Sequence, residues 1–215
     1  MNIIVACEFS AVVREAFRKR NHNAWSCDLL ESEVPSKYHF KDDIQRVLSY
    51  KSSLTWDLMI AHPPCTYLCV TGNKWFYHPA DKHLPLEQRR PHPRFPDRKK
   101  KQSDALDFIK FLLNSSIKKI CLENPIGIIS TKIRKPDQII QPFQFGHPEP
   151  KKTCLWLKNL PKLVPTKIVE PEYMISKSGK RLAKWYYQPS QSRKRQRDRE
   201  RTFQGIADAM AAQWG

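Results

Sequence analysis

The sequence predicts an α/β fold in which a mostly parallel sheet carries helices on both faces. Short apolar runs with strand character alternate along the chain with segments whose apolar residues recur at helical spacing. This alternation is typical of parallel sheets, because crossover helices join consecutive parallel strands. The chain has 215 residues, of which 40% are hydrophobic, and this is enough for the core of one medium-sized domain.

Four elements are expected in the first part of the chain. In order, they are a strand at 3–7, a helix at 11–20, a strand at 23–27 and a short helix at 44–48. Ser10 is expected to cap the first helix, since a serine hydroxyl accepts hydrogen bonds from unpaired N–H groups at a helix start. Asp28 closes the second strand, and Asp42 and Asp43 precede the second helix, whose positive end favours acidic side chains.

Four more elements are expected in the second part. In order, they are a strand at 58–61, an amphipathic helix at 102–114, a strand at 117–122 and a closing helix at 203–214. Pro63 and Pro64 exclude both a helix and further strand pairing, so the chain must leave the sheet abruptly after the first of these strands. Glu123 follows the second strand.

Two basic stretches interrupt this pattern, at 73–101 and at 158–201. The first mixes prolines and basic residues with aromatic residues, and its length predicts a mobile functional loop. The second is irregular and basic throughout. We therefore expect a main domain at 1–157, a small segment at 158–201 and a C-terminal helix at 202–215 that returns to the main domain.

The charge of the chain predicts its class of partner. Lys and Arg number 38 against 21 Asp and Glu, which gives a formal net charge of +17. Such an excess favours a polyanionic partner, with nucleic acid as the first candidate and an anionic membrane surface as the second. No apolar run reaches the roughly 18 residues of a spanning helix, and no signal peptide is visible. We expect a monomer in the cytoplasm, away from membranes.

The six cysteines are scattered, and five of them are interpreted as structural thiols. Cys65 and Cys69 are the only close pair, and without a second pair they do not predict a metal site. Cys65 lies just past the double proline, at the edge of the sheet where open α/β folds bind ligands. A thiol there is either a buried structural residue or, once deprotonated, a nucleophile.

Five short motifs follow one another at expected strand or helix ends. They are Glu8-Phe9-Ser10, Asp28, Asp43-Ile44, Pro63-Pro64-Cys65 and Glu123-Asn124-Pro125. Their order resembles the DNA cytosine 5-methyltransferase family, in particular the short versions carried by phages and prophages. The resemblance spans nearly the whole chain and implies a Rossmann-like class I fold that uses S-adenosylmethionine.

The resemblance implies three catalytic residues. Cys65 would add as a thiolate to carbon 6 of cytosine, so that carbon 5 can attack an electrophilic methyl group. Glu123 would hold ring nitrogen 3 and the exocyclic amine, and we expect burial to raise its pKa so that it can protonate the ring. Lys151 stands where the family has the first arginine of a Gln-x-Arg-x-Arg pattern, and it would reach the base carbonyl. Taken alone, Glu123 is equally a helix cap and Lys151 a phosphate contact.

The resemblance also implies a cofactor site, although the glycines of the family's Phe-x-Gly-x-Gly loop are absent. Phe9 would stack on the adenine, Asp28 would accept from the ribose hydroxyls, and Asp43 would bind the adenine amine. Taken alone, Asp28 and Asp43 are a turn residue and an N-cap. The residues expected to bind S-adenosylmethionine are Glu8, Phe9, Ser10, Asp28, Leu29, Asp43, Ile44 and Pro63.

Double-stranded DNA is the implied partner, with the target base flipped out of the helix to meet Cys65. The loop at 73–101 stands at the position of the family's catalytic loop, and the segment at 158–201 at that of its target-recognition region. The residues expected to contact DNA are Lys74, Arg89, Arg90, Arg94, Arg193 and Arg195. Each of them could equally be a solvated surface charge.

The sequence therefore predicts a DNA (cytosine-5-)-methyltransferase. Two alternatives remain open at this point. One is a related pyrimidine-modifying enzyme, which acts on RNA cytosine or transfers a different group from a modified cofactor. The other is a basic DNA-binding protein that keeps the fold without the activity.

Overall fold

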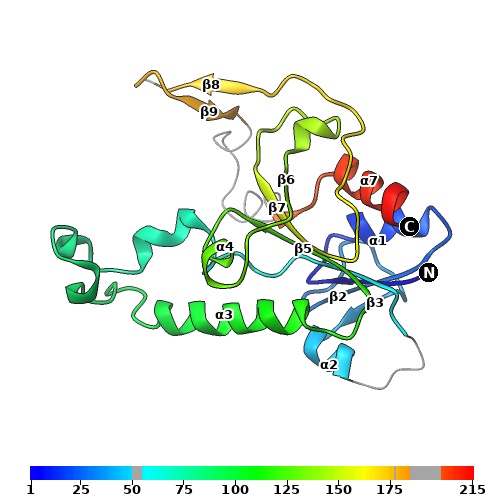
Figure 1. The fold of residues 1–215 in the computed structure, drawn as a ribbon, viewed down its shortest axis with the longest axis horizontal. Coiled ribbons are helices and arrows are strands. Elements are labelled where there is room, and N and C mark those ends of the chain that lie inside the picture. The colour runs from blue at the N-terminus through cyan, green and yellow to red at the C-terminus, as the bar shows by residue number, and fades with distance from the viewer. Residues whose placement is uncertain (50–54, 177, 185–199) are drawn as a thin grey trace.

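The computed structural model describes residues 1–49, 55–176, 178–184 and 200–215 (Figure 1). The sheet strands are β1 (Asn2–Ala6), β2 (Asn23–Asp28), β3 (His39–Lys41), β4 (Leu58–Ala61), β5 (Lys119–Pro125), β6 (Gln138–Ile140) and β7 (Thr153–Lys158). The α-helices are α1 (Val12–Arg18), α2 (Ile44–Ser49), α3 (Arg98–Leu113), α4 (Ile129–Lys132) and α7 (Gln204–Trp214). Short 3-10 turns are η1 (Val70–Trp75), η2 (Pro79–Asp81), η3 (Leu86–Gln88) and η4 (Pro142–Gln144), and a separate hairpin is formed by β8 (Tyr173–Ile175) and β9 (Arg181–Ala183).

The seven sheet strands lie in the order β3-β2-β1-β4-β5-β7-β6. The pairs from β3 to β5 are all parallel, whereas β7 runs antiparallel to both of its neighbours, β5 and β6. The strand order reverses direction between β1 and β4, and ligands of open α/β sheets bind outside the carboxyl ends of the strands at such a switch point. The predicted fold class, a mostly parallel sheet within an α/β domain, is confirmed.

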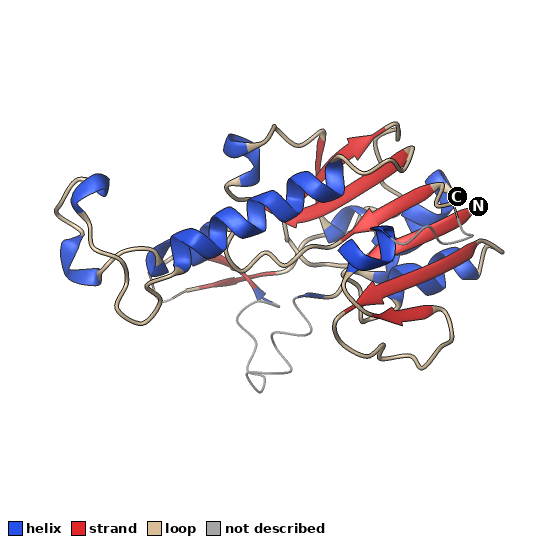
Figure 2. Cartoon of the chain, turned by 90° about the horizontal axis from the view of Figure 1, so that it is seen from below, coloured by secondary structure: helices blue, strands red, loops and turns tan. Residues whose placement is uncertain are grey.

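Both faces of the sheet are covered (Figure 2). Successive side chains of a strand point to opposite faces, so Ile3 packs with one core and Ile4 with the other. The first core contains the apolar sides of α1 and α7, and the second contains those of α2, α3 and α4. Burial of these apolar side chains on both faces is the main force that holds the sheet between its helices.

The sequence prediction failed mainly around β7. The strand expected at 117–122 continues to Pro125, because β7 pairs with it from Lys158 back to Thr153. This pairing was hidden because the β7 sequence lies next to lysines in a stretch without strand alternation. The strands β3 and β6 have three residues each, too few for a periodic signal.

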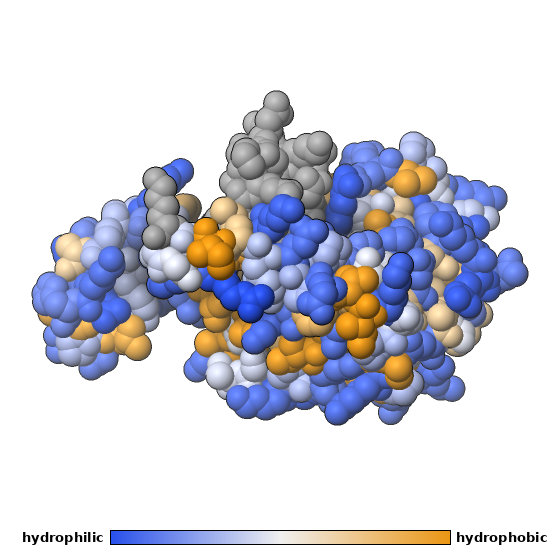
Figure 3. Space-filling model, turned by 90° about the horizontal axis from the view of Figure 1, so that it is seen from above, coloured by the Kyte–Doolittle hydropathy of each residue, from blue (hydrophilic) through white to orange (hydrophobic). Residues whose placement is uncertain are grey.

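Two projections extend from the sheet on the same side of the molecule, away from both termini (Figure 1). One is the arm, which we define as residues 70–97, and the other is the β8–β9 hairpin. Figure 3 shows the arm as a separate lobe with a largely hydrophilic surface. The arm overlaps most of the loop at 73–101 that the sequence predicts to be mobile, and it contains the hydrogen-bonded turns η1, η2 and η3. Within the described ranges, no helix has the length and apolar character needed to cross a membrane.

Candidate active site at the carboxyl edge of the sheet

The turn after β4 is tied to the end of β5. Ala61 of β4 lies opposite Leu122 of β5, so the residues that follow them emerge side by side. The buried Asn124 side chain donates a 2.8 Å hydrogen bond to the Pro63 carbonyl, which fixes the turn against the end of β5. The first residue of this turn, His62, still donates its backbone N–H to Ala6 of β1 over 2.9 Å.

A second contact holds the loop after Cys65 against the loop after β5. The Ile128 N–H donates to the Leu68 carbonyl over 2.8 Å, and the Val70 N–H donates to the Ile126 carbonyl over 3.2 Å. A Cβ at Gly127 would lie 2.0 Å from the Leu68 carbonyl oxygen, so only glycine permits this approach. The loop that carries Cys65 is therefore fixed relative to Glu123.

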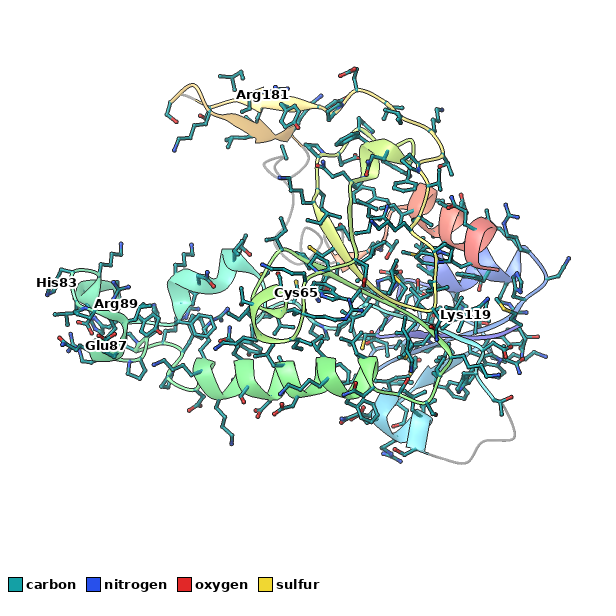
Figure 4. All side chains as sticks on the ribbon, viewed as in Figure 1. Cys65, His83, Glu87, Arg89, Lys119 and Arg181 are labelled. Atoms are coloured by element: carbon teal, nitrogen blue, oxygen red, sulfur yellow. The ribbon has the colours of Figure 1, made fainter. Side chains whose placement is uncertain are left out.

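The three residues predicted to be catalytic come together at this edge. The charges of Glu123 and Lys151 both act on the Cys65 thiol, the first raising and the second lowering its pKa. Figure 4 shows Cys65 at the end of the sheet from which the arm and the hairpin project, whereas Lys119, at the start of β5, lies on the side of the termini. A thiol, a carboxylate and an ammonium group thus share one location.

The predicted pKa of Glu123 is wrong in direction. Burial does raise the pKa of this carboxyl, but three effects outweigh it. They are a hydrogen bond from His62, the charge of Lys151 and the charge of His62, and together they bring the pKa of Glu123 below its ordinary value. The carboxyl is therefore ionised in the free protein, and any proton that it gives to a base must first come from a neighbour.

His62 is the residue that the sequence analysis missed. Its Nδ1 lies 3.1 Å from Oε2 of Glu123, and its side chain is 8% exposed. The Thr202 hydroxyl lies 3.5 Å from the same nitrogen. A histidine directly before the double proline was visible in the sequence, but nothing there indicated that it would point toward the end of the neighbouring strand.

The contact between Cys65 and Cys69 shifts the pKa values of the two thiols in opposite directions. One turn of chain joins Cys65 to Cys69, whose N–H donates to the Cys65 carbonyl over 3.0 Å. A hydrogen bond between the two thiols raises the pKa of Cys65, and burial adds to this. The same bond lowers the pKa of Cys69, helped by the Thr71 hydroxyl at 3.0 Å and the Gly72 amide. Cys69, interpreted from the sequence as structural, is thus the thiol that ionises first.

The polar side chain of Glu8, in the loop after β1, is hydrogen-bonded to the backbone at the start of α1. The buried Glu8 carboxylate accepts the N–H of Val13 over 2.6 Å and that of Arg14 over 3.1 Å, and so satisfies the start of α1. The expectation that Ser10 is the N-cap is wrong, because the N-cap is Ala11. Burial is the main reason that the pKa of Glu8 is raised.

Ala11 adopts a left-handed backbone conformation, with φ 65° and ψ 2°. It stands at the first glycine position of the Phe-x-Gly-x-Gly pattern that the sequence resembles. A glycine would adopt this conformation at little cost, whereas a side chain with a Cβ costs about 1–2 kcal/mol there. The loop therefore keeps a backbone conformation typical of glycine at a position that has lost the glycine.

The residues after β2 reach the same edge of the sheet. Asp28 is partly exposed, and its Oδ1 accepts the Leu30 N–H over 2.9 Å. Burial is the main cause that raises the pKa of Asp28. Leu29 is 72% exposed, so a flat ligand could pack on it. Asp28 and Leu29 together offer a carboxylate and an apolar surface next to the switch point.

The other expected cofactor residues are more constrained. Asp43 caps α2, because its Oδ1 accepts the Gln45 N–H over 2.8 Å, and Ile44 is buried in the core. The Phe9 carbonyl accepts the Glu33 N–H over 2.8 Å, and Phe9 is partly exposed. Pro63 lines a groove of about 360 Å³ between the Cys65 turn and α3.

The segment before α7 closes over this edge from the C-terminal side. Arg201 forms a 2.6 Å ion pair with Glu33, and the Lys151 Nζ lies 5.7 Å from the centre of the Phe203 ring. The Gly205 N–H donates to Nε2 of His147 over 2.9 Å, and a Cβ at Gly205 would collide with a backbone carbonyl. These contacts place the C-terminal segment beside both His62 and Lys151.

The basic residues of the arm serve its architecture. Arg90 forms a bidentate pair with the buried Asp81 at 2.6 and 3.0 Å, and this pair lowers the pKa of Asp81. Arg89 donates to two arm carbonyls at 2.7 and 2.9 Å. Lys74 and Arg94 lie over the rings of the aromatic residues that follow them. The two remaining residues predicted to bind DNA, Arg193 and Arg195, lie outside the part of the chain that the structure describes.

Arg98 links the arm to the Cys65 turn. Its side chain is buried at the start of α3 and donates a 2.6 Å hydrogen bond to the Thr66 carbonyl. The guanidinium lies 5.1 Å from the ring centre of Tyr67 and 5.0 Å from that of Phe76. A change in the position of the arm would therefore act on the residue directly after Cys65.

No group of three or more His, Cys, Asp or Glu side chains in the described part of the chain is arranged to hold a metal ion.

Comparison with known proteins gives one structural likeness to report. No protein-family model matches it, and a search of curated proteins finds no match. Among solved structures, the fold resembles a protein described as a DNA modification methyltransferase encoded within a prophage of E. coli, with 13% identity and a TM-score of 0.49. The alignment covers 79% of this chain and 52% of that one, so this chain spans about half the length of the structure that it resembles. We therefore argue the function from this chain's own residues.

Proposed function

We propose that the protein is a DNA cytosine-5 methyltransferase. It would transfer a methyl group from S-adenosylmethionine to carbon 5 of a flipped-out cytosine through a covalent bond to Cys65. The observation that carries this proposal is the position of Cys65 at the carboxyl edge of the sheet, within reach of the charges of both Glu123 and Lys151. A nucleophile, an acid and a cation at one location are the groups that addition to a pyrimidine ring requires.

The chemistry begins with the Cys65 sulfur, which forms a bond to carbon 6 of the base. Its proton passes along the existing hydrogen bond to Cys69, the thiol that ionises first. Glu123 binds ring nitrogen 3 and the exocyclic amine, and Lys151 donates to the carbonyl oxygen. Carbon 5 then carries the electron density with which it attacks the methyl group.

The residues at the neighbouring strand ends fit S-adenosylmethionine. Asp28 is a partly exposed carboxylate at the end of β2, suited to ribose hydroxyls, and the exposed Leu29 and partly exposed Phe9 offer apolar surface to the adenine. Glu8 and Asp43 contribute less than the sequence suggested, because their carboxylates cap α1 and α2. The bound cofactor supplies the electrophilic methyl group.

The charge and shape of the chain favour DNA as the substrate. The formal net charge is +17, and the arm and hairpin both project on the side where Cys65 lies (Figure 4). A polyanion placed between them would meet Lys and Arg side chains on both projections. Arg181 of the hairpin lies 4.1 Å from the ring centre of Tyr173, and such an aromatic and basic pair suits an unstacked base.

Bisulfite sequencing tests the proposal. DNA from a host that expresses the parent protein should contain protected cytosines within one short sequence context, and DNA from a host that expresses Cys65→Ala should contain none. A Cys121→Ala variant is the matched control, since this cysteine is buried in β5, away from the edge. Protection that persists in Cys65→Ala, or is missing with the parent protein, would contradict the proposal.

A further inference from the structure

We propose that His62 is the proton source of this site, which supplies through Glu123 the proton that the cytosine ring takes up at nitrogen 3. The inference rests on the proposed function and extends it to a residue before the double proline. Three features carry it: the contact between His62 and Glu123, the burial of both side chains, and the charges around them.

The contact is fixed by the backbone on both sides. His62 remains paired with β1 through its N–H, and Asn124 next to Glu123 holds the Pro63 carbonyl. The imidazole therefore has little freedom to move away from the carboxylate. Its Nδ1 stands 3.1 Å from Oε2 of Glu123, which is a distance suitable for direct proton transfer.

Burial makes this contact unusual. The side chains of His62 and Glu123 are 8% and 16% exposed. Nε2 of His62 is buried and has no hydrogen-bond partner in the part of the chain that the structure describes. A buried ring nitrogen without a partner is costly in a purely structural histidine, and it is expected where a substrate or a proton relay completes the site.

Three charged side chains and one hydroxyl, from four parts of the chain, surround the pair formed by His62 and Glu123. Glu8 comes from the loop after β1 and Glu123 from β5, and the charge of His62 acts on both carboxyls. Lys151, which precedes β7, acts on Glu123 from another direction, and the Thr202 hydroxyl approaches from the segment before α7. A proton on His62 therefore lies between two carboxylates, of which one, Glu123, is expected to face the base.

When the Cys65 sulfur bonds to carbon 6, electrons of the ring double bond move toward nitrogen 3. The Glu123 carboxylate takes the Nδ1 proton of His62 and passes it to nitrogen 3, so Glu123 ends this step ionised and the imidazolium becomes a neutral imidazole. When carbon 5 has lost its hydrogen as a proton to solvent and the sulfur–carbon bond has broken, nitrogen 3 returns its proton through Glu123 to His62. The pair thus begins and ends the cycle with the same proton.

This step explains how an ionised Glu123 can act as an acid. The hydrogen bond from His62 lowers the pKa of Glu123, so the free carboxylate has no proton of its own to give. The same hydrogen bond is the path by which a proton reaches it. In this arrangement His62 both stabilises the anion before the base arrives and neutralises it afterwards.

A His62→Asn variant separates proton transfer from positioning. The asparagine amide can donate to Glu123 from nearly the place of Nδ1, but it has no proton to give up at physiological pH. In single-turnover methylation of cytosine-containing DNA, we expect the rate of this variant to fall by about 100-fold and its pH profile to lose the step that depends on the imidazole in the parent protein. His22→Asn, at the amino end of β2, is the control and should retain the parent rate.

The outcomes are distinct. A His62→Asn variant with the parent rate, or with a lower rate but the parent pH profile, would overturn the proton-transfer role. A parent protein that methylates no cytosine would overturn the proposed function, and this inference with it. A normal thermal unfolding transition of His62→Asn shows that any loss of rate is not a loss of fold.

Discussion

The two sides of the switch point use similar side chains for different purposes. On the β1 side, the buried carboxylate of Glu8 accepts two backbone N–H groups and completes the start of α1. On the β4–β5 side, the carboxylate of Glu123 accepts from a side chain, His62, and lies close to Cys65 and Lys151. A carboxylate at a strand end is therefore not evidence of a site until its partners are known.

The largest effect is expected from Glu123→Gln. The amide keeps the size of the side chain but cannot pass a proton from His62 to the base, so the methylation rate should fall by about 10³-fold. The rate is measured with labelled S-adenosylmethionine at saturating DNA. Glu8→Gln is the matched variant on the other side, and it should retain most of the activity while losing about 1 kcal/mol of stability from the weakened cap. Equal losses of activity in Glu123→Gln and Glu8→Gln would contradict the claim that Glu123 serves the reaction whereas Glu8 serves the helix cap.

The two carboxyls should also give opposite dependences of stability on pH. The folded pKa of Glu8 is raised, so its contribution is present at low pH and is lost as pH rises through that pKa. The folded pKa of Glu123 is lowered, so its contribution is present above the unfolded pKa and is lost as pH falls through the folded one. Urea unfolding over a pH series measures the free energy of unfolding of the parent protein, Glu8→Gln and Glu123→Gln. If the difference between parent and variant changed with pH in the same direction for both variants, the assigned pKa shifts would be contradicted.

Cys69→Ala should give the next largest effect. It removes the group that receives the Cys65 proton and also the hydrogen bond that is the largest cause of the raised Cys65 pKa, but burial still raises that pKa. Formation of the covalent adduct should therefore slow by about 100-fold at neutral pH and recover at higher pH, where Cys65 loses its proton to solvent. The time course of adduct formation with 5-fluorocytosine DNA measures this rate. The buried Cys154→Ala is the control. An unchanged rate at neutral pH would show that Cys65 ionises without Cys69.

Asp81→Asn should affect the arm and leave the sheet intact. The change removes the charge that holds Arg90, so the arm should open more often to protease. Limited trypsin digestion should then cleave faster after Lys82 and Arg89, and DNA binding should weaken. A cleavage rate equal to that of the parent protein would show that the aromatic contacts of the arm hold it without the ion pair.

The smallest effect is expected at Ala11. Ala11→Gly relieves a left-handed alanine but adds backbone entropy to the unfolded chain, so we expect a gain in stability of up to about 1 kcal/mol. Ala16→Gly, in the buried interior of α1, is the control and should lose about 1 kcal/mol or more. Both values come from urea unfolding. If Ala11→Gly lost as much free energy of unfolding as Ala16→Gly, the backbone strain assigned to Ala11 would be contradicted.

The sequence predicted what depends on local pattern. An apolar run predicts strand β4, and the two prolines after it, Pro63 and Pro64, predict the turn. The structure places both where expected. The sequence could not predict partners that the fold brings together from distant segments. His62 meets Glu123 across 61 positions of sequence, and this contact reverses the predicted pKa shift of Glu123.

The arm shows the same limit. Its arginines were predicted to bind DNA from their charge and position, but the charge pattern gave no sign that Arg89 and Arg90 already bond to the arm itself. The first loop has no glycine at the positions of the Phe-x-Gly-x-Gly pattern that it resembles, yet Ala11 has a glycine-like conformation. Side-chain partners and backbone strain both depend on tertiary packing, which a single sequence does not encode as a local signal.

The measurement that tests the account most directly is the identity of the residue bound to a trapped base. In 5-fluorocytosine, fluorine replaces the carbon 5 hydrogen that must be lost as a proton before the sulfur–carbon bond can break. With 5-fluorocytosine DNA and S-adenosylmethionine, the protein should therefore stay bound to the base after methyl transfer. We expect mass spectrometry of the digested complex to find the nucleotide on Cys65, and no complex to form with Cys65→Ala. A nucleotide found on Cys69 or on another residue, or no complex with the parent protein, would contradict the central claim.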